Sequence, residues 1–211
     1  MRPGCEFFLP ASDRSRHHRR VPAEIRDYRP GDEQAWLRCR VLAFLGTAYF
    51  DDVCTSKPVL ARGAALVAAD QADQAIVGVL DLSVDGALAT IDTIAVHPDC
   101  QGAGVGTALF ERARVKAAAL GAVTIDAWTR DDEPALAWYR ARGFAESAHY
   151  LHVYADYYVS AAEPPAAVIA RPDFEPIKIF LHAPLAREAE LRRTFRRVHV
   201  CRRFARPVSS G

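Results

Sequence analysis

The stretch from Asp92 to Thr107 joins an apolar strand to a glycine-spaced loop and then, without a break, to a helix. Glycines at 102, 104 and 106 let the backbone approach a ligand closely. Successive N–H groups in such a loop, backed by the positive end of a helix dipole, bind a diphosphate without any lysine. The junction therefore predicts a phosphate-binding site.

The spacing separates this loop from two other phosphate loops. A nucleoside-triphosphate loop ends in Gly-Lys-Ser/Thr, whereas Gly106 is followed by Thr107 and Ala108. A dinucleotide fingerprint needs a third glycine where Thr107 stands. The Gln-x-x-Gly-x-Gly pattern from Gln101 to Gly106 instead resembles the coenzyme A pyrophosphate loop of the GNAT superfamily of acyl-CoA-dependent N-acyltransferases. The resemblance implies that acetyl-CoA is bound by Ile94, Ala95, Val96, Gln101, Gly102, Ala103, Gly104, Val105, Gly106 and Thr107.

A second motif downstream is also similar to GNAT sequences. Tyr139 precedes Gly143-Phe144 by four residues, and in that family a tyrosine so placed lies beside the thioester. A phenol has an ordinary pKa near 10 and a thiol near 8.5, so Tyr139 stays protonated at neutral pH and can protonate the departing thiolate. The resemblance therefore implies an N-acetyltransferase that transfers acetyl to a primary amine by direct attack, with Tyr139 as general acid.

The general base is expected to be Asp92, acting through a water. It lies four residues before Val96, where polyamine acetyltransferases of the superfamily carry an acidic residue. Strand alternation predicts that Asp92 shares a side of its strand with Ile94 and Val96. The rivals for this role are Asp81, Asp126 and His97.

One family feature is altered. Many members carry an asparagine seven residues before the tyrosine, where it contacts the cofactor, but this sequence has Asp132 there. An ionised carboxylate cannot donate a hydrogen bond, so we expect Asp132 to cap a helix instead.

The acceptor is expected to be a small-molecule or peptide amine. In the superfamily the first helix and the segment after it line the acceptor site, which here contain Trp36, Phe44, Tyr49 and Phe50. The opposite wall is assigned to Tyr150, His152 and Tyr154. Aromatic walls suit many amines, so the acceptor's identity stays open.

Two other functions are alternatives to this enzyme. The first is a catalytically silent acyl-CoA-binding regulatory domain, which would not need the Tyr139 hydroxyl. The second is a nucleic-acid contact through the arginine-rich segment from Arg187 to Arg206. An ion pair between Glu188 and Arg192 on a packed helix is the preferred interpretation of that segment.

Composition fits one domain in the cytoplasm. The chain has 211 residues, half of them hydrophobic, and no run that predicts a signal peptide or membrane span. Its five cysteines show no zinc-ligand spacing, so neither a metal nor disulfides are expected. Whether the protein forms a homodimer stays open.

These residues need an α/β scaffold to position them. Residues 1–22 are expected to be a disordered leader, and 23–211 one domain with a core (23–158), a linker (159–176) and an added strand-helix-strand segment (177–211). Periodicity predicts strands near 24–28, 64–69, 75–83, 88–96, 123–128, 144–158, 177–182 and 199–204. Helices are expected after Pro30, over 107–120, after Asp132 and along Leu191, Phe195 and Val198. The GNAT resemblance adds a mixed, mostly antiparallel sheet that splays between its fourth and fifth strands, with helices flanking it.

Overall fold

The computed structural model describes residues 22–169, 171 and 173–209. Nearly all of the expected leader therefore lies outside the described residues. The strands are β1 (Ala23–Asp27), β2 (Gly63–Asp70), β3 (Ile76–Asp85), β4 (Leu88–Val96), β5 (Thr124–Thr129), β6 (Ala145–Asp156), β7 (Lys178–Ala183) and β8 (Arg197–Pro207). The helices are α1 (Glu33–Leu45), α2 (Val105–Ala119), α3 (Glu133–Arg140), α4 (Glu163–Ala167) and α5 (Glu188–Thr194). In this part of the chain the strands form one sheet in the order β1-β2-β3-β4-β5-β8-β6-β7.

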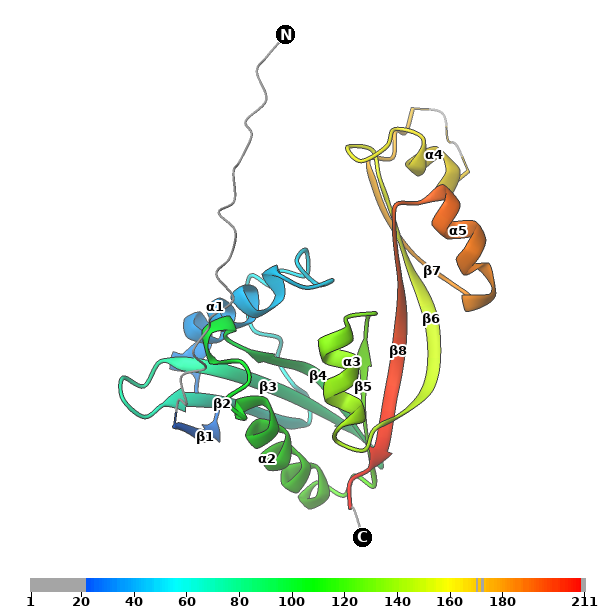
Figure 1. The fold of residues 1–211 in the computed structure, drawn as a ribbon. Coiled ribbons are helices and arrows are strands. Elements are labelled where there is room, and N and C mark those ends of the chain that lie inside the picture. Colours follow the sequence, from blue (N-terminus) through cyan, green and yellow to red (C-terminus); the bar gives the residue numbers. More distant parts are fainter. Residues whose placement is uncertain (1–21, 170, 172, 210–211) are drawn as a thin grey trace.

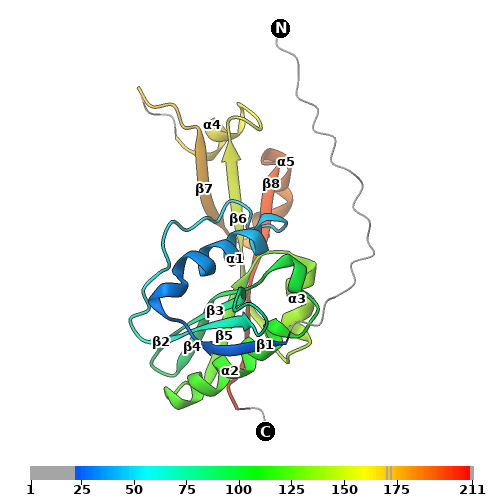
Figure 2. The same ribbon diagram turned by 90° about the vertical axis from the view of Figure 1, so that its left-hand side faces the viewer.

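Helices α1 and α2 cover opposite faces of the first strands (Figures 1 and 2). Alternate residues of β2 and β3 face each helix: Val67 and Val79 pack against α1, whereas Leu66 and Leu80 pack against α2. These strands are buried on both sides, which explains why their sequences are mostly apolar. The expected α/β class, with a mixed and mostly antiparallel sheet, is confirmed.

The sheet opens between β4 and β5, as expected. These neighbours are parallel, and they pair only from Leu88 to Ile91 on β4 and from Thr124 to Ala127 on β5. Beyond this point β4 continues to Val96 and β5 to Thr129 while the two strands separate. The backbone of β4 after Ile91 is therefore left without a partner strand on the β5 side, within the described chain.

Strand β8 lies between β5 and β6, so the chain returns to the centre of the sheet at Arg197. The upper parts of β6 and β8, with β7, α4 and α5, extend away from the rest of the molecule as an arm (Figure 1). The arm has its own apolar cluster, which includes Leu151, Val153, Leu191, Phe195 and Val198.

Two sequence expectations for the arm were wrong in detail. The predicted linker contains α4, where Glu163 is buried and accepts hydrogen bonds from the N–H groups of Asp156 and Arg196. The last predicted helix ends at Thr194, so Phe195 follows it and Val198 lies on β8. Both side chains still face the arm's cluster, because the strand that begins at Arg197 carries Val198 toward the same core.

Candidate active site

A β-bulge places Asp92. Asp81 pairs with Thr93 while Leu82 pairs with Ile91, so β4 has one extra residue at Asp92. Ile91 faces the α2 side, yet after the bulge Ala95 faces the α1 side. The expectation that Asp92 shares a side with Ile94 and Val96 was therefore wrong, because those two pack toward α2 whereas Asp92 accepts a hydrogen bond from Ser83 on the other face.

Asp92 remains the most accessible of the four candidate bases. Its carboxylate is exposed and accepts from the Ser83 hydroxyl at 3.1 Å. Partial burial, together with the nearby charge of Asp126, raises its pKa, although the Ser83 hydrogen bonds oppose the shift. A carboxylate with a raised pKa is a better proton acceptor near neutral pH.

The three rivals are engaged in structural contacts. Asp81 is buried 3.1 Å from the ammonium of Lys57. Asp126 is buried and accepts from the hydroxyl of Thr90 and the guanidinium of Arg203. The Nδ1 atom of His97 accepts from a backbone N–H in the turn that follows it.

The glycine loop has the geometry that its sequence requires. Gly102 and Gly104 have φ values of 76° and 87°, a region that disfavours residues with a Cβ atom. Gly104 is also the N-cap of α2, so the first N–H groups of a 15-residue helix follow directly. The side-chain amide of Gln101 donates to the Val96 carbonyl at 3.2 Å, which ties the loop to the end of β4.

One cavity of about 670 Å³ joins the loop to the open part of the sheet. Its lining includes nine of the ten predicted cofactor residues; the tenth, Ala103, packs against the apolar core. Asp92 and Tyr139 line the same cavity. The lining residues missed by sequence reasoning include Arg40, Trp128, Trp138 and Arg142.

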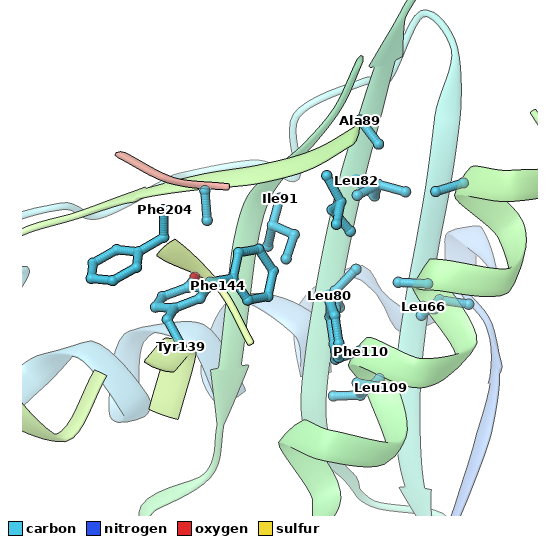
Figure 3. Packing of buried hydrophobic residues seen from close by; sticks show 14 of the residues in the cluster. Leu66, Leu80, Leu82, Ala89, Ile91, Leu109, Phe110, Tyr139, Phe144 and Phe204 are labelled. Atoms are coloured by element: carbon cyan, nitrogen blue, oxygen red, sulfur yellow. The ribbon is translucent and has the colours of Figure 1, made fainter. Parts of the chain in front are cut away.

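Tyr139 is held by aromatic rings. Only 5% of the residue is exposed. Its ring stacks on Phe204 of β8 at 5.5 Å and meets Phe144 edge-on at 5.2 Å (Figure 3). Burial raises the pKa of its hydroxyl well above the ordinary value of a phenol. Tyr139 therefore stays protonated throughout the physiological range.

Arg142 brings a cation to the loop. Its guanidinium donates to the Thr107 hydroxyl and to the Trp138 carbonyl, and it lies 4.0 Å from the centre of the Trp138 ring. The Nε–H group is buried and has no hydrogen-bond partner among the described residues. The sequence signal for this cation was the spacing of four residues between Trp138 and Arg142, which lets the arginine fold back over the ring.

Residues 61–146 match the family model of the acetyltransferase (GNAT) domain. The matched segment is less than half of the chain, and it contains the glycine loop and Tyr139. This segment is a GNAT acetyltransferase domain, whose activity class is acyl transfer and whose cosubstrate is an acyl-CoA.

Solved GNAT structures share the fold at low sequence identity. The ribosomal-protein-S18-alanine N-acetyltransferase from Escherichia coli is 17% identical, with 90% of this chain and 96% of that chain covered and a TM-score of 0.54. A putative acyl-CoA N-acyltransferase from Klebsiella pneumoniae is 15% identical, with 89% and 99% covered and a TM-score of 0.56. Nourseothricin acetyltransferase is 19% identical, with 89% and 99% covered and a TM-score of 0.54. No curated protein matches the sequence.

The part of the cavity where the acceptor was expected differs in part from the prediction. Phe44 and Tyr49 line it, but Trp36 is fully buried beneath α1. The Phe50 ring lies outside the cavity, 4.5 Å from the Arg197 guanidinium. The expected opposite wall belongs to the arm, and Trp128 links it to the cavity.

Asp132 lies at the N-cap of α3, as expected. Its side chain makes no capping hydrogen bond in the described structure and lines the cavity instead. The position was predicted correctly, whereas the hydrogen bond was not. An asparagine side chain there could donate to a cofactor, which this carboxylate cannot do when ionised.

Within residues 22–169, 171 and 173–209, no three His, Cys, Asp or Glu side chains are grouped as a metal site would require. The helices of the same residues include none long and apolar enough to cross a membrane.

Proposed function

We propose that the protein is an N-acetyltransferase that transfers acetyl from acetyl-CoA to a primary amine by direct attack on the thioester. The observation that carries this proposal is the single cavity shared by the glycine loop, the unpaired part of β4, Asp92 and Tyr139. A cosubstrate that is anionic at one end and reactive at the other fits a cavity with the glycine loop and these two side chains in its lining.

The cofactor end follows from backbone geometry. The N–H groups of the loop and of the first turn of α2 would hold the pyrophosphate, with Arg142 adding a charge-assisted contact. The pantetheine arm would pair with the β4 backbone at Ile94, Ala95 and Val96, where β5 has moved away. A backbone N–H of this segment would polarise the thioester carbonyl.

The reaction then needs two proton transfers. The amine nitrogen forms a bond to the carbonyl carbon, the carbon–sulfur bond breaks, and the amine loses a proton through a water to Asp92. The departing CoA thiolate takes the proton of the Tyr139 hydroxyl, which is regained from solvent. Asp92 faces the α1 side at the bulge, where Phe44 and Tyr49 line the acceptor end.

The direct test is CoA release from acetyl-CoA in the presence of a panel of amines. The panel should contain amino-acid amides, peptides with free N-termini, lysine derivatives, polyamines and aminoglycosides. Acetyl-CoA binding with amine-dependent CoA release supports the enzyme. Tight acetyl-CoA binding without release for any amine would favour the silent regulatory domain.

Replacing Asp92 with asparagine should lower kcat about tenfold, less than the usual effect of losing a general base, because the bridging water can still accept the amine proton. Wild-type kcat/KM should already fall as pH drops below the pKa of the acceptor amine, and it should fall more steeply below the raised pKa of Asp92, where the base also gains a proton. The profile of the Asp92→Asn variant should show only the ionisation of the acceptor amine. A pH profile measured from 4 to 9 checks this.

The matched control is Ser83→Ala, which removes the hydroxyl that donates to Asp92. Because that hydrogen bond lowers the carboxylate's pKa, its loss should shift the acidic limb to higher pH and leave the maximal rate nearly unchanged. Identical profiles for wild type and Asp92→Asn would exclude Asp92 as the base.

Replacing Arg142 with alanine should raise the Kd for acetyl-CoA about tenfold, as expected for one lost hydrogen bond to a charged group. Binding of S-acetylpantetheine, which lacks the pyrophosphate, should not change. Arg140→Ala is the control, because Arg140 lies only two residues before Arg142, at the end of α3, but pairs with Glu133 at the surface. Equal weakening of both ligands by Arg142→Ala would show that Arg142 only supports the fold.

A further inference from the structure

A series of aromatic rings leads from the cavity onto the arm. Trp128 of β5 lines the cavity, and its ring centre is 5.0 Å from that of Tyr150 on β6. Tyr150 is 4.6 Å from His182 on β7, and His182 is 5.1 Å from Phe180. We call these four residues the ring track. Tyr150 and His182 also line a shallower hollow of about 380 Å³, together with Ala183 and Pro184.

The ring track is exposed but held in place. Trp128 is 40% exposed and Phe180 is 50% exposed, so the rings at both ends face solvent. Beneath them His152 is buried and stacks on His182 at 5.0 Å, with 10° between the rings. His152 accepts from the Arg130 guanidinium at 3.2 Å and lies 3.1 Å from the Tyr150 hydroxyl. Rings fixed in advance bind a partner at little cost in conformational entropy.

Charges beside the ring track are already compensated. Arg197 makes a double hydrogen bond with Asp51, and Arg130 lies 3.7 Å from the same carboxylate. His199 contacts Asp131 at 2.7 Å. A surface that binds phosphate groups presents cations without such partners. These pairs favour a ligand recognised through apolar side chains and backbone over a nucleic acid.

The outer edge of the ring track coincides with a sheet edge. β7 is the last strand of the sheet, and it carries both Phe180 and His182. An extended peptide can hydrogen-bond to such an edge while its side chains contact the exposed rings. At about 3.3 Å per extended residue, the ring track matches about four residues.

We propose that the ring track binds the first residues of a polypeptide whose N-terminal α-amine enters the cavity. This inference rests on the proposed function and names its acceptor class. The ring track leaves the cavity in one direction, which fits a chain terminus better than a lysine in mid-chain. An α-amine, with a pKa of about 8, is also partly neutral at pH 7 and needs only a weak base such as Asp92.

The test compares single amino-acid amides with an equimolar hexapeptide library that has free N-termini and a fluorescent label at the C-terminus. Wild-type kcat/KM for CoA release should be at least about tenfold higher with the library. Phe180→Ala should abolish this length advantage, while turnover of the amides and the KM for acetyl-CoA stay unchanged. Phe174→Ala, an exposed phenylalanine elsewhere on the arm, is the matched control and should behave as wild type.

Fluorescence anisotropy of the same library measures binding without turnover. Peptide binding that Phe180→Ala weakens would support the ring track even if no CoA were released, in which case the proposed function alone fails. Turnover of amides with no length advantage would overturn the inference and leave the enzyme intact. Preferential binding of a single-stranded oligonucleotide, lost in Phe180→Ala, would overturn it in favour of nucleic acid.

Discussion

A Tyr139→Phe variant is expected to lose about 100-fold in kcat while its Kd for acetyl-CoA changes by less than twofold. General acid catalysis typically contributes a factor of about 100 or more. The ring stacks on Phe204 and meets Phe144 edge-on, and phenylalanine preserves both contacts, so the substitution removes little besides the hydroxyl. The measurement is steady-state CoA release alongside calorimetric titration with acetyl-CoA.

Tyr154→Phe is the control for this variant. Tyr154 lies on the arm and does not line the cavity, so loss of its hydroxyl should leave kcat unchanged. Unchanged turnover in Tyr139→Phe would remove Tyr139 from the mechanism. A large rise in the Kd for acetyl-CoA would instead assign the hydroxyl to cofactor binding.

Phe204→Ala should lower the free energy of unfolding by about 3–5 kcal/mol, the usual cost of truncating a buried phenylalanine. The Phe204 side chain is almost fully buried and belongs to the cluster that contains Tyr139. The substitution should also weaken acetyl-CoA turnover, because the support of Tyr139 becomes a void (Figure 3). Urea denaturation followed by circular dichroism gives the stability change.

Phe174→Ala serves again as the comparison, since that side chain is largely exposed and its removal should change stability by less than about 0.5 kcal/mol. A Phe204→Ala protein as stable as wild type would mean that β8 contributes little to the core. Loss of stability without loss of turnover would separate the strand's packing from its role beside Tyr139.

Much of the scaffold could be predicted from local patterns. Residues 88–96 form β4 with the predicted bounds, and the helix after the glycine loop differs from the prediction by two residues at its start. Glycine spacing and apolar periodicity are local properties, so they can be recognised from the sequence alone. The splay between β4 and β5 came from the family resemblance, because no residue pattern encodes the separation of two strands.

Other features depend on contacts between distant segments. The bulge at Asp92 changes which face of the sheet the carboxylate occupies. The alternation of side chains along β4 does not predict this bulge. Arg142 reaches the loop because α3 ends beside Thr107, which is set by tertiary packing. Trp36 was predicted to line the acceptor site but lies in the hydrophobic core. The amphipathic pattern of a helix does not show how deeply each ring is buried.

The insertion of β8 between β5 and β6 has a consequence for biosynthesis. A ribosome makes the glycine loop, β5 and Tyr139 long before it makes residues 197–207. Until then the outer edge of β5 has no neighbour and Tyr139 lacks the Phe204 ring. The nascent chain would therefore hold an unpaired, aggregation-prone strand edge beside an incompletely packed Tyr139, and the sheet is completed only when β8 inserts between β5 and β6.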